Sequence, residues 1–366
     1  MTHCPATPDP SVRTASALSD RTHRTAPDPS VRTASALSDR THRTAPEPPE
    51  RTASALSDRT AREPHGPVAR PVLAGLTDEA AASLDGQLAV VRTLGWTAVE
   101  IRSVDGVPLA DLPRDEVGAM ARRLAESGTR VVCLASRIGN WARPITSDFA
   151  QDLDELRVLE EYADLLDCRR VRVMSYPNDG LPDAEWGRRA VERLRRLTDR
   201  AEEAGLTLLH ENCAGWAGDD AERALRLLEE VDSPALRLLF DIGNGVPYGY
   251  RAAGLLRPLL PYVDHVHVKD AVRDAAGGTA YTLPGDGEAE VRTCLRMLAE
   301  AGYDGAYSIE PHLAVRPHEG LARPGEGAAD LFVRAGRRLA ELLDAPAFRT
   351  PTDDAPADHG PGGGTP

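Results

Sequence analysis

The sequence predicts a (β/α)8 barrel over residues 67–345, and three observations support this fold class. Short apolar runs alternate with segments of helical spacing, which is typical of strand–helix–strand units around a parallel sheet. Eight such units fit into about 275 residues, a usual length for a closed barrel. An open doubly wound sheet would favour a Gly-rich phosphate turn after its first strand, and Leu73-Ala74-Gly75-Leu76-Thr77 does not supply one.

The expected elements follow from hydrophobic periodicity along the chain. The expected strands cover residues 72–76, 97–101, 130–135, 170–175, 206–211, 236–241, 263–268 and 305–310. The expected helices cover residues 78–94, 114–127, 148–166, 184–204, 219–230, 255–260, 288–301 and 328–343. Each expected helix separates two expected strands or closes the series, as a barrel requires.

Two segments outside this domain have a different composition. Residues 1–66 hold a 19-residue repeat, in which 27–45 copies 8–26 letter for letter and 46–64 is a degraded third copy. Each copy is poor in apolar residues, so we predict disorder for 1–66 and for the Pro/Gly-rich tail 346–366.

Composition narrows the class of function. The formal net charge of −14 argues against a nucleic acid partner, because an acidic chain repels phosphate backbones. No apolar run is long enough for a transmembrane helix, and no secretory signal is visible. The five cysteines are scattered and form no C-x-x-C pair, which makes a reducing cytoplasm the simplest location.

Four consecutive expected strands each end in a metal-binding residue type. Glu211, Asp241, His267 and Glu310 lie at these ends, with spacings of 30, 26 and 43 residues. Active sites of such barrels lie at the carboxyl ends of the strands, so the four side chains should meet at one rim. A single carboxylate there is more often a helix cap or an arginine partner, but four in a row predict a metal site. Three carboxylates and one imidazole suit Mn²⁺ best, with Mg²⁺, Co²⁺ or Zn²⁺ as alternatives.

The runs HVHVKD, FDIGN and GYDGAYSIEPH, with the stretch PGDGEAEVRTCLRMLAEAGYDG, resemble the sugar phosphate isomerase/epimerase superfamily, also called xylose isomerase-like TIM barrels. The resemblance covers roughly residues 70–343 and is strongest over 206–312. It implies a divalent ion bound by Glu211, Asp241, His267 and Glu310, with Glu211 and Glu310 also acting as the acid–base pair on a small sugar, sugar phosphate or polyol. It further implies that His267, not His265, is the ligand, and we expect His265 to point the other way. Relatives are often dimers or tetramers, so a homo-oligomer is a further expectation.

Other residues are candidates for the substrate pocket. Lys269, the single lysine of the chain, lies two residues beyond His267 and either binds a substrate oxygen or phosphate or pairs with Asp241, Asp270 or Glu310. Asn244 stands where many relatives carry a histidine, and Trp141 either walls the pocket or packs. Glu100 is a weaker candidate for the base; a salt bridge with Arg102 or another barrel arginine is the favoured role. His210 and His312 flank ligands and receive no assigned role.

Three alternatives to an isomerase or epimerase stay open at this point. A dehydratase of a keto-inositol or of dehydroshikimate needs the same metal and the same enolisation. An endonuclease IV-like repair enzyme is disfavoured by the acidic chain and by Asn244 in place of a histidine. A non-catalytic barrel that only binds a ligand would not need to keep all four ligands.

Overall fold

A computed structural model describes residues 71–275, 277–316, 324–325 and 327–345. Its central sheet has eight strands in the order β1-β12-β9-β8-β7-β6-β5-β2, and all of the paired strands are parallel. The strands are β1 (Val72–Gly75), β2 (Ala98–Ile101), β5 (Arg130–Ala135), β6 (Arg170–Ser175), β7 (Thr207–Gly215), β8 (Leu236–Asp241), β9 (Val263–Val268) and β12 (Ala306–Ile309). A parallel bridge between Leu76 and Glu100 joins the first strand to the second. The described chain is therefore a (β/α)8 barrel, which confirms the predicted fold class.

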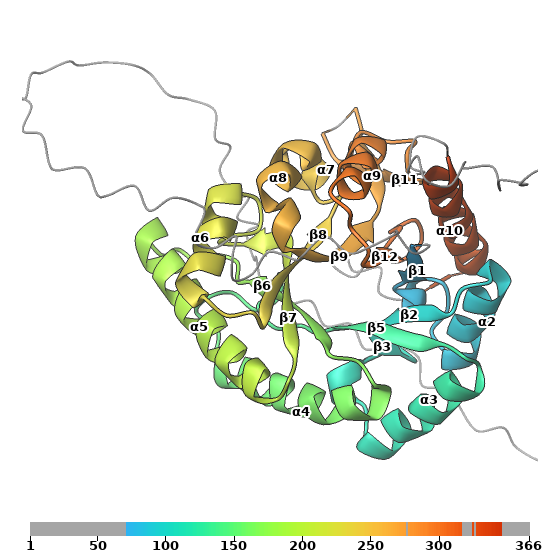
Figure 1. Ribbon diagram of the computed structural model, residues 1–366, viewed down its shortest axis with the longest axis horizontal. Helices are drawn as coiled ribbons and strands as arrows, with labels where there is room; N and C mark the ends of the chain where they lie inside the picture. The colour runs from blue at the N-terminus through green and yellow to red at the C-terminus, as the bar shows by residue number, and fades with distance from the viewer. Residues whose placement is uncertain (1–70, 276, 317–323, 326, 346–366) are drawn as a thin grey trace, which may run out of the picture. The chain divides into compact units, whose positions relative to one another are not determined.

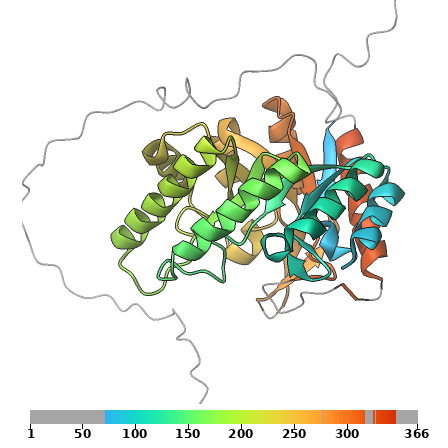
Figure 2. The same ribbon diagram turned by 90° about the horizontal axis from the view of Figure 1, so that it is seen from below.

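Helices surround the strands, as Figures 1 and 2 show from two directions. They are α2 (Leu84–Leu94), α3 (Arg114–Glu126), α4 (Ala150–Leu166), α5 (Asp183–Glu203), α6 (Ala221–Val231), α7 (Gly245–Tyr248), α8 (Ala252–Leu259), α9 (Val291–Glu300) and α10 (Ala328–Asp344). The short 3-10 helices are η1 (Thr77–Glu79), η2 (Leu109–Asp111) and η3 (Leu260–Tyr262). None of the described helices is long and apolar enough to cross a membrane.

Local chemistry explains where several helices begin and end. The side chain of Ser83 accepts a hydrogen bond from the Gly86 N–H at the start of α2. Asp220 caps α6 in the same way, through the N–H groups of Glu222 and Arg223. Such caps satisfy N–H groups that have no partner inside the helix. Gly95 ends α2 with a φ of 68°, a conformation that glycine adopts without a steric penalty.

A small apolar cluster lies below part of the barrel rim. Cys133, Leu209 and Leu239 form a buried cluster inside the barrel. Leu209 and Leu239 lie two residues before Glu211 and Asp241, and alternate residues of a strand share one face. The two carboxylates therefore stand one step above this packed apolar cluster.

Some features differ from the predicted elements. Helix α2 begins at Leu84 rather than at residue 78, because Asp78 and Glu79 lie in a 3-10 turn and bind side chains from other strands. Strand β7 continues past Glu211 to Gly215. Two hairpins were not predicted: β3 (Ser103–Val104) with β4 (Val107–Pro108), and β10 (Asp270–Arg273) with β11 (Thr279–Thr282).

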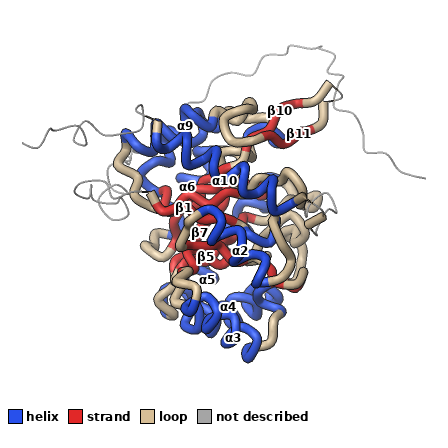
Figure 3. The backbone as a smooth tube through the Cα atoms, turned by 90° about the vertical axis from the view of Figure 1, so that its right-hand side faces the viewer, coloured by secondary structure: helices blue, strands red, loops and turns tan. Residues whose placement is uncertain are grey.

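Figure 3 shows the β10–β11 hairpin apart from the central strands. The predicted repeat segment 1–66 and tail 346–366 lie outside the described residues.

Candidate metal and substrate site

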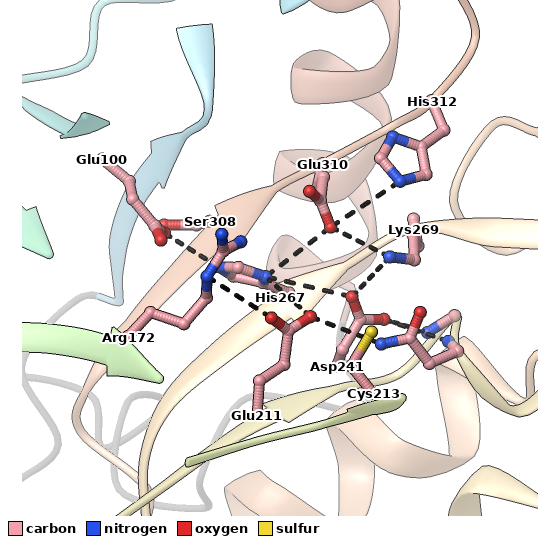
Figure 4. A network of polar contacts seen from close by, with 12 residues as sticks. Glu100, Arg172, Glu211, Cys213, Asp241, His267, Lys269, Ser308, Glu310 and His312 are labelled. Atoms are coloured by element: carbon pink, nitrogen blue, oxygen red, sulfur yellow. Dashed lines mark hydrogen bonds and ion pairs between the residues drawn. The ribbon is translucent and has the colours of Figure 1, made fainter. Parts of the chain in front are cut away.

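The four residues predicted as metal ligands lie together at the carboxyl end of the barrel. Glu211, Asp241, His267 and Glu310 each offer a ligand atom, and these atoms lie within 4.8 Å of one another. All four side chains are buried. Figure 4 shows them converging from neighbouring strands β7, β8 and β9 and from the residue that follows β12. The adjacent strand order thus places one donor per strand around a common point.

His267 is the centre of this cluster. Its Nδ1 lies 3.8 Å from Glu211 Oε1, 3.9 Å from Asp241 Oδ2 and 3.7 Å from Glu310 Oε2. These separations exceed hydrogen-bond length, and within the described residues the buried Nδ1 has no hydrogen-bond partner. An imidazole nitrogen facing three carboxylate oxygens is a donor set that can bind a divalent cation. Two ligands of one such ion stand roughly 3–3.6 Å apart, so these donors fit a metal after small side-chain adjustments.

Glu100 fixes the orientation of His267. Its Oε2 lies 2.8 Å from His267 Nε2. Burial opposes ionisation, but His267 and His265 hold the pKa of Glu100 well below its usual value, so it is a carboxylate and can only accept. Nε2 therefore donates, and in the neutral imidazole the lone pair of Nδ1 faces the three other carboxylates. This is the carboxylate–histidine arrangement that orients histidine ligands in metal sites.

Two expectations about this region were wrong. His265 does not point away from His267, because residues two apart on a strand share a face. Its Nε2 lies 3.0 Å from the same Glu100 oxygen and 3.0 Å from Ser308 Oγ. Glu100 consequently binds two histidines instead of forming the favoured salt bridge with Arg102.

Glu310 is held by two cations. Arg102 Nη1 donates to its Oε1 at 2.9 Å, and Lys269 Nζ donates to its Oε2 at 2.9 Å. Lys269 Nζ also lies 2.7 Å from Asp241 Oδ2, so the lysine bridges two of the predicted ligands. Burial works against ionisation of Glu310, yet Lys269, His312, His267 and Arg102 together hold its pKa well below its usual value. The pairing of Lys269 with both Asp241 and Glu310 is the salt-bridge alternative considered for it, and it lies within the candidate site.

Glu211 has a different environment from Glu310. Burial raises its pKa, with Arg172 and His267 opposing the rise. Asn244 Nδ2 donates to Glu211 Oε1 at 3.3 Å, while Oε2 has no hydrogen-bond partner within the described chain and lies 3.5 Å from Arg172 Nε. Asn244 also donates from its backbone N–H to Asp241 Oδ1 at 3.1 Å. Asn244 therefore connects two of the predicted ligands.

A cavity of about 430 Å³ opens above this cluster and is large enough for a sugar-sized molecule. Glu211, Asn244, Lys269 and Glu310 line its floor, and Trp141 lies in its wall with 45% of its surface exposed. All three residues predicted for substrate binding, Lys269, Asn244 and Trp141, thus line the same cavity. Their function there stays a prediction.

Sequence reasoning missed a second pair at this rim. Glu79 accepts two hydrogen bonds from His312, one from its backbone N–H and one from Nδ1, each at 2.8 Å. His312 Nε2 lies 3.9 Å from Glu310 Oε2 (Figure 4), and the residue lines the cavity. Glu79 follows the first strand by four residues, so a search of strand ends that included β1 could have found it. His210, by contrast, is buried beside Glu211, and burial lowers its pKa to about 4.

The fold and the donor cluster together define a barrel with a hard anionic site at the carboxyl ends of its strands. The family model described as xylose isomerase-like TIM barrel matches residues 88–330. The chain belongs to this family, as the motifs HVHVKD and FDIGN predicted.

Curated relatives cover part of the chain. An inosose dehydratase of Bacillus thuringiensis (strain Al Hakam) is 29% identical over 168 residues, which are 42% of this chain and 55% of the relative. A 2-epi-5-epi-valiolone 7-phosphate 2-epimerase of Actinoplanes sp. is 34% identical over 174 residues, or 47% of this chain and 61% of the relative. The chain thus spans between half and two thirds of the length of these relatives, and both are enzymes.

Solved structures support the fold. A xylose isomerase-like TIM barrel protein from Mycobacterium smegmatis, in complex with magnesium, superposes with a TM-score of 0.54. It is 21% identical, and the alignment covers 75% of this chain and 97% of that one. Similarity at this level shows a shared barrel and leaves the reaction open.

Proposed function

We propose that this protein is a divalent-metal-dependent isomerase or epimerase that removes and returns a proton beside the carbonyl group of a sugar or polyol. The observation that carries the proposal is the environment of the His267 Nδ1 atom. It is buried, has no hydrogen-bond partner among the described residues and faces Glu211, Asp241 and Glu310. Glu211, Asp241, His267 and Glu310 are the assigned ligands, for Mn²⁺ first and for Mg²⁺, Co²⁺ or Zn²⁺ as alternatives.

The reaction requires an acidified C–H bond and a nearby base. A bound divalent cation supplies Lewis-acid stabilisation of the enediolate that forms when the proton leaves. We assign the proton transfers to Glu211 and Glu310. Glu211 Oε2 accepts no hydrogen bond from the described chain, so a proton on it displaces no hydrogen-bond donor. Both oxygens of Glu310 already accept from Arg102 and Lys269, so a proton on Glu310 weakens these two charge-assisted contacts.

Two further residues would position the substrate. Lys269 presents a buried ammonium group at the cavity floor, where it can donate to a hydroxyl or carbonyl oxygen. Asn244 is held by its contacts with Glu211, Asp241 and the Asn212 carbonyl, and it offers its amide oxygen at the same floor. Glu211, Lys269 and Glu310 are buried at this floor, which strengthens each electrostatic contact.

The test is proton exchange in deuterated water, followed by proton NMR. The metal-loaded protein should exchange the proton beside the carbonyl of a ketose or an inosose, and the chelator-treated protein should not. Glu211→Gln should abolish the exchange while the protein stays folded. Exchange that survives both treatments would contradict the proposal.

A dehydratase is the second candidate, and a specific contact favours it. Loss of a hydroxyl group after enolisation needs a proton donor near the base, and His312 lies 3.9 Å from Glu310 with its ring held by Glu79. The curated inosose dehydratase supports the same reading. Product analysis separates the two reactions: an epimerase gives a stereoisomer of equal mass, and a dehydratase gives a product lighter by one water. His312→Asn should then slow the loss of water more than the proton exchange.

A further inference from the structure

The charge of the substrate is open, because the two curated relatives differ on this point. One acts on an inosose, and the other is named for a 7-phosphate. A phosphate monoester carries a charge of about −1.5 to −2 at pH 7 and is usually bound by guanidinium groups, lysines or backbone N–H groups. A cavity that binds a phosphate ester should therefore offer such donors to it.

The cations at the cavity floor are already paired. Arg102 donates to Asp78 at 2.9 Å and to Glu310 at 2.9 Å, and it also contacts Glu79 at 3.4 Å. Lys269 is buried between Asp241 and Glu310, as described above. A phosphate that approached either cation would have to replace a carboxylate and would then lie beside it.

The other two arginines that line the cavity are also opposed by carboxylates. Arg137 binds both oxygens of Asp111, at 2.6 and 2.7 Å, and contacts Glu155 at 3.3 Å. Arg172 is buried with its Nε 3.5 Å from Glu211 Oε2 and donates to a backbone carbonyl. Within the described residues, each Arg or Lys that lines the cavity thus has an acidic partner.

A group of converging backbone N–H donors after the seventh barrel strand is also occupied by a carboxylate. In barrels of this class, loops after strands seven and eight often bind phosphate through their N–H groups. Here the N–H groups of Ala271, Gly285, Gly287 and Ala289 all donate to the carboxylate of Asp270, at 2.8–3.0 Å. Asp270 is fully buried. The Asp270 carboxylate therefore occupies these four N–H groups, so they are not available to a phosphate.

The rim of the cavity is aromatic instead. Trp141 and Tyr248 line it with 45% and 43% of their surfaces exposed. Exposed aromatic side chains at the mouth of a polar cavity can pack against the C–H face of a sugar or cyclitol ring. The hydroxyl groups of that ring can then point to the polar floor.

We infer that the site takes an uncharged polyhydroxy carbonyl compound, such as an unphosphorylated ketose or a keto-cyclitol, and discriminates against the phosphate ester. The inference takes the reaction from the proposed function. It takes the charge of the substrate from the contacts of Arg102, Arg137, Arg172, Lys269 and Asp270. The ring of the substrate lies against Trp141 and Tyr248, and its oxygens face the donors of the floor.

The experiment uses the metal-loaded full chain and matched probes. An inosose, D-fructose, D-fructose 6-phosphate and inorganic phosphate are compared by calorimetry for binding and by exchange in deuterated water for turnover. We expect the unphosphorylated compounds to bind at least about tenfold tighter than the phosphate ester, which is about 1.4 kcal/mol, with no competition from inorganic phosphate. Trp141→Ala should raise KM for the preferred compound about tenfold with kcat little changed, and Val107→Ala, at an exposed neighbour outside the cavity lining, should leave both unchanged.

The outcomes separate this inference from the proposed function. Tighter binding or faster exchange of the phosphate ester, or competition by inorganic phosphate, overturns the inference. Binding of the uncharged compounds without any proton exchange overturns the proposed reaction and leaves the charge preference standing. Failure of every carbonyl compound to bind overturns both.

Discussion

His267 and Glu100 are joined by a buried hydrogen bond of 2.8 Å between Nε2 and Oε2, across 167 positions of sequence. This contact decides which imidazole nitrogen faces the three acidic side chains at the rim. It links the second barrel strand to the seventh and places a residue without direct metal contact in control of a predicted ligand.

Replacing Glu100 should therefore weaken metal binding. Glu100→Gln replaces a carboxylate, which can only accept, with an amide, which can also donate. His267 Nε2 is then no longer required to carry the proton, and the ring can turn or change tautomer. We expect a 10- to 100-fold loss of metal affinity, measured by competition with a chelator. Ser308→Ala removes the hydroxyl group that contacts His265 and leaves the Glu100–His267 contact intact. This variant should change the affinity far less. Equal affinities for wild type and Glu100→Gln would show that the contact does not orient the ligand.

Metal binding should release protons and should strengthen with pH. Burial alone would lower the pKa of His267, but Glu100, Glu310 and Glu211 raise it from 6.5 to about 9 in the metal-free protein. The charged ring therefore contributes stability below pH 6.5, and this contribution is lost as the pH rises through about 9. An ion needs the neutral ring, so affinity should rise by up to about tenfold per pH unit between pH 6.5 and 9.

Calorimetry in two buffers of different ionisation enthalpy at pH 7.5 counts the released protons. Wild type should release about one proton more per bound ion at pH 7.5 than at pH 10, which lies above the pKa of His267. A wild type that releases none would contradict the assigned state of His267.

Lys269 should stabilise the metal-free protein more than the metal-loaded one. Lys269→Met leaves Asp241 and Glu310 buried without their common cation, which costs about 3–5 kcal/mol when a buried pair is broken. A bound divalent ion replaces part of that charge, so metal should raise the melting temperature of the variant more than that of wild type. Arg170→Met removes an ion pair with Asp264 that includes no predicted ligand, and its response to metal should match wild type.

Helix α5 offers a test of packing that is independent of the site. Gly187 lies against the buried Trp216, and a Cβ built there would stand 2.6 Å from the indole ring. Gly187→Ala should cost about 1–3 kcal/mol of unfolding free energy through overpacking. Gly118→Ala in α3 meets only the far end of Arg122 at 3.8 Å and should stabilise by about 0.5–1 kcal/mol, both measured by urea denaturation. A stabilising Gly187→Ala would show that α5 packs differently.

The sequence alone predicted the strands well because they are short, apolar and bounded by polar residues. The strands at 130–135, 170–175, 236–241 and 263–268 agree with β5, β6, β8 and β9. The convergence of Glu211, Asp241, His267 and Glu310 followed from a rule of topology, since parallel strands of a barrel end at one rim.

The remaining features depend on contacts between distant parts of the chain. Local helical spacing favoured a helix from residue 78, but Asp78 and Glu79 bind Arg102 and His312 instead, which no local pattern reveals. The partners of Glu100 likewise lie on the seventh strand. The error over His265 has another origin, because strict alternation already places it on the same face as His267.

The most direct test is the metal content of the purified full chain by elemental mass spectrometry. Wild type is measured beside His267→Ala, Glu310→Gln and Glu222→Gln, the last at an exposed carboxylate of α6. The account predicts about one divalent ion per chain in wild type and Glu222→Gln, and little or none in the other two. A wild type that stays metal-free after Mn²⁺, Mg²⁺, Co²⁺ and Zn²⁺ have been supplied would contradict the metal site and the proposed reaction together.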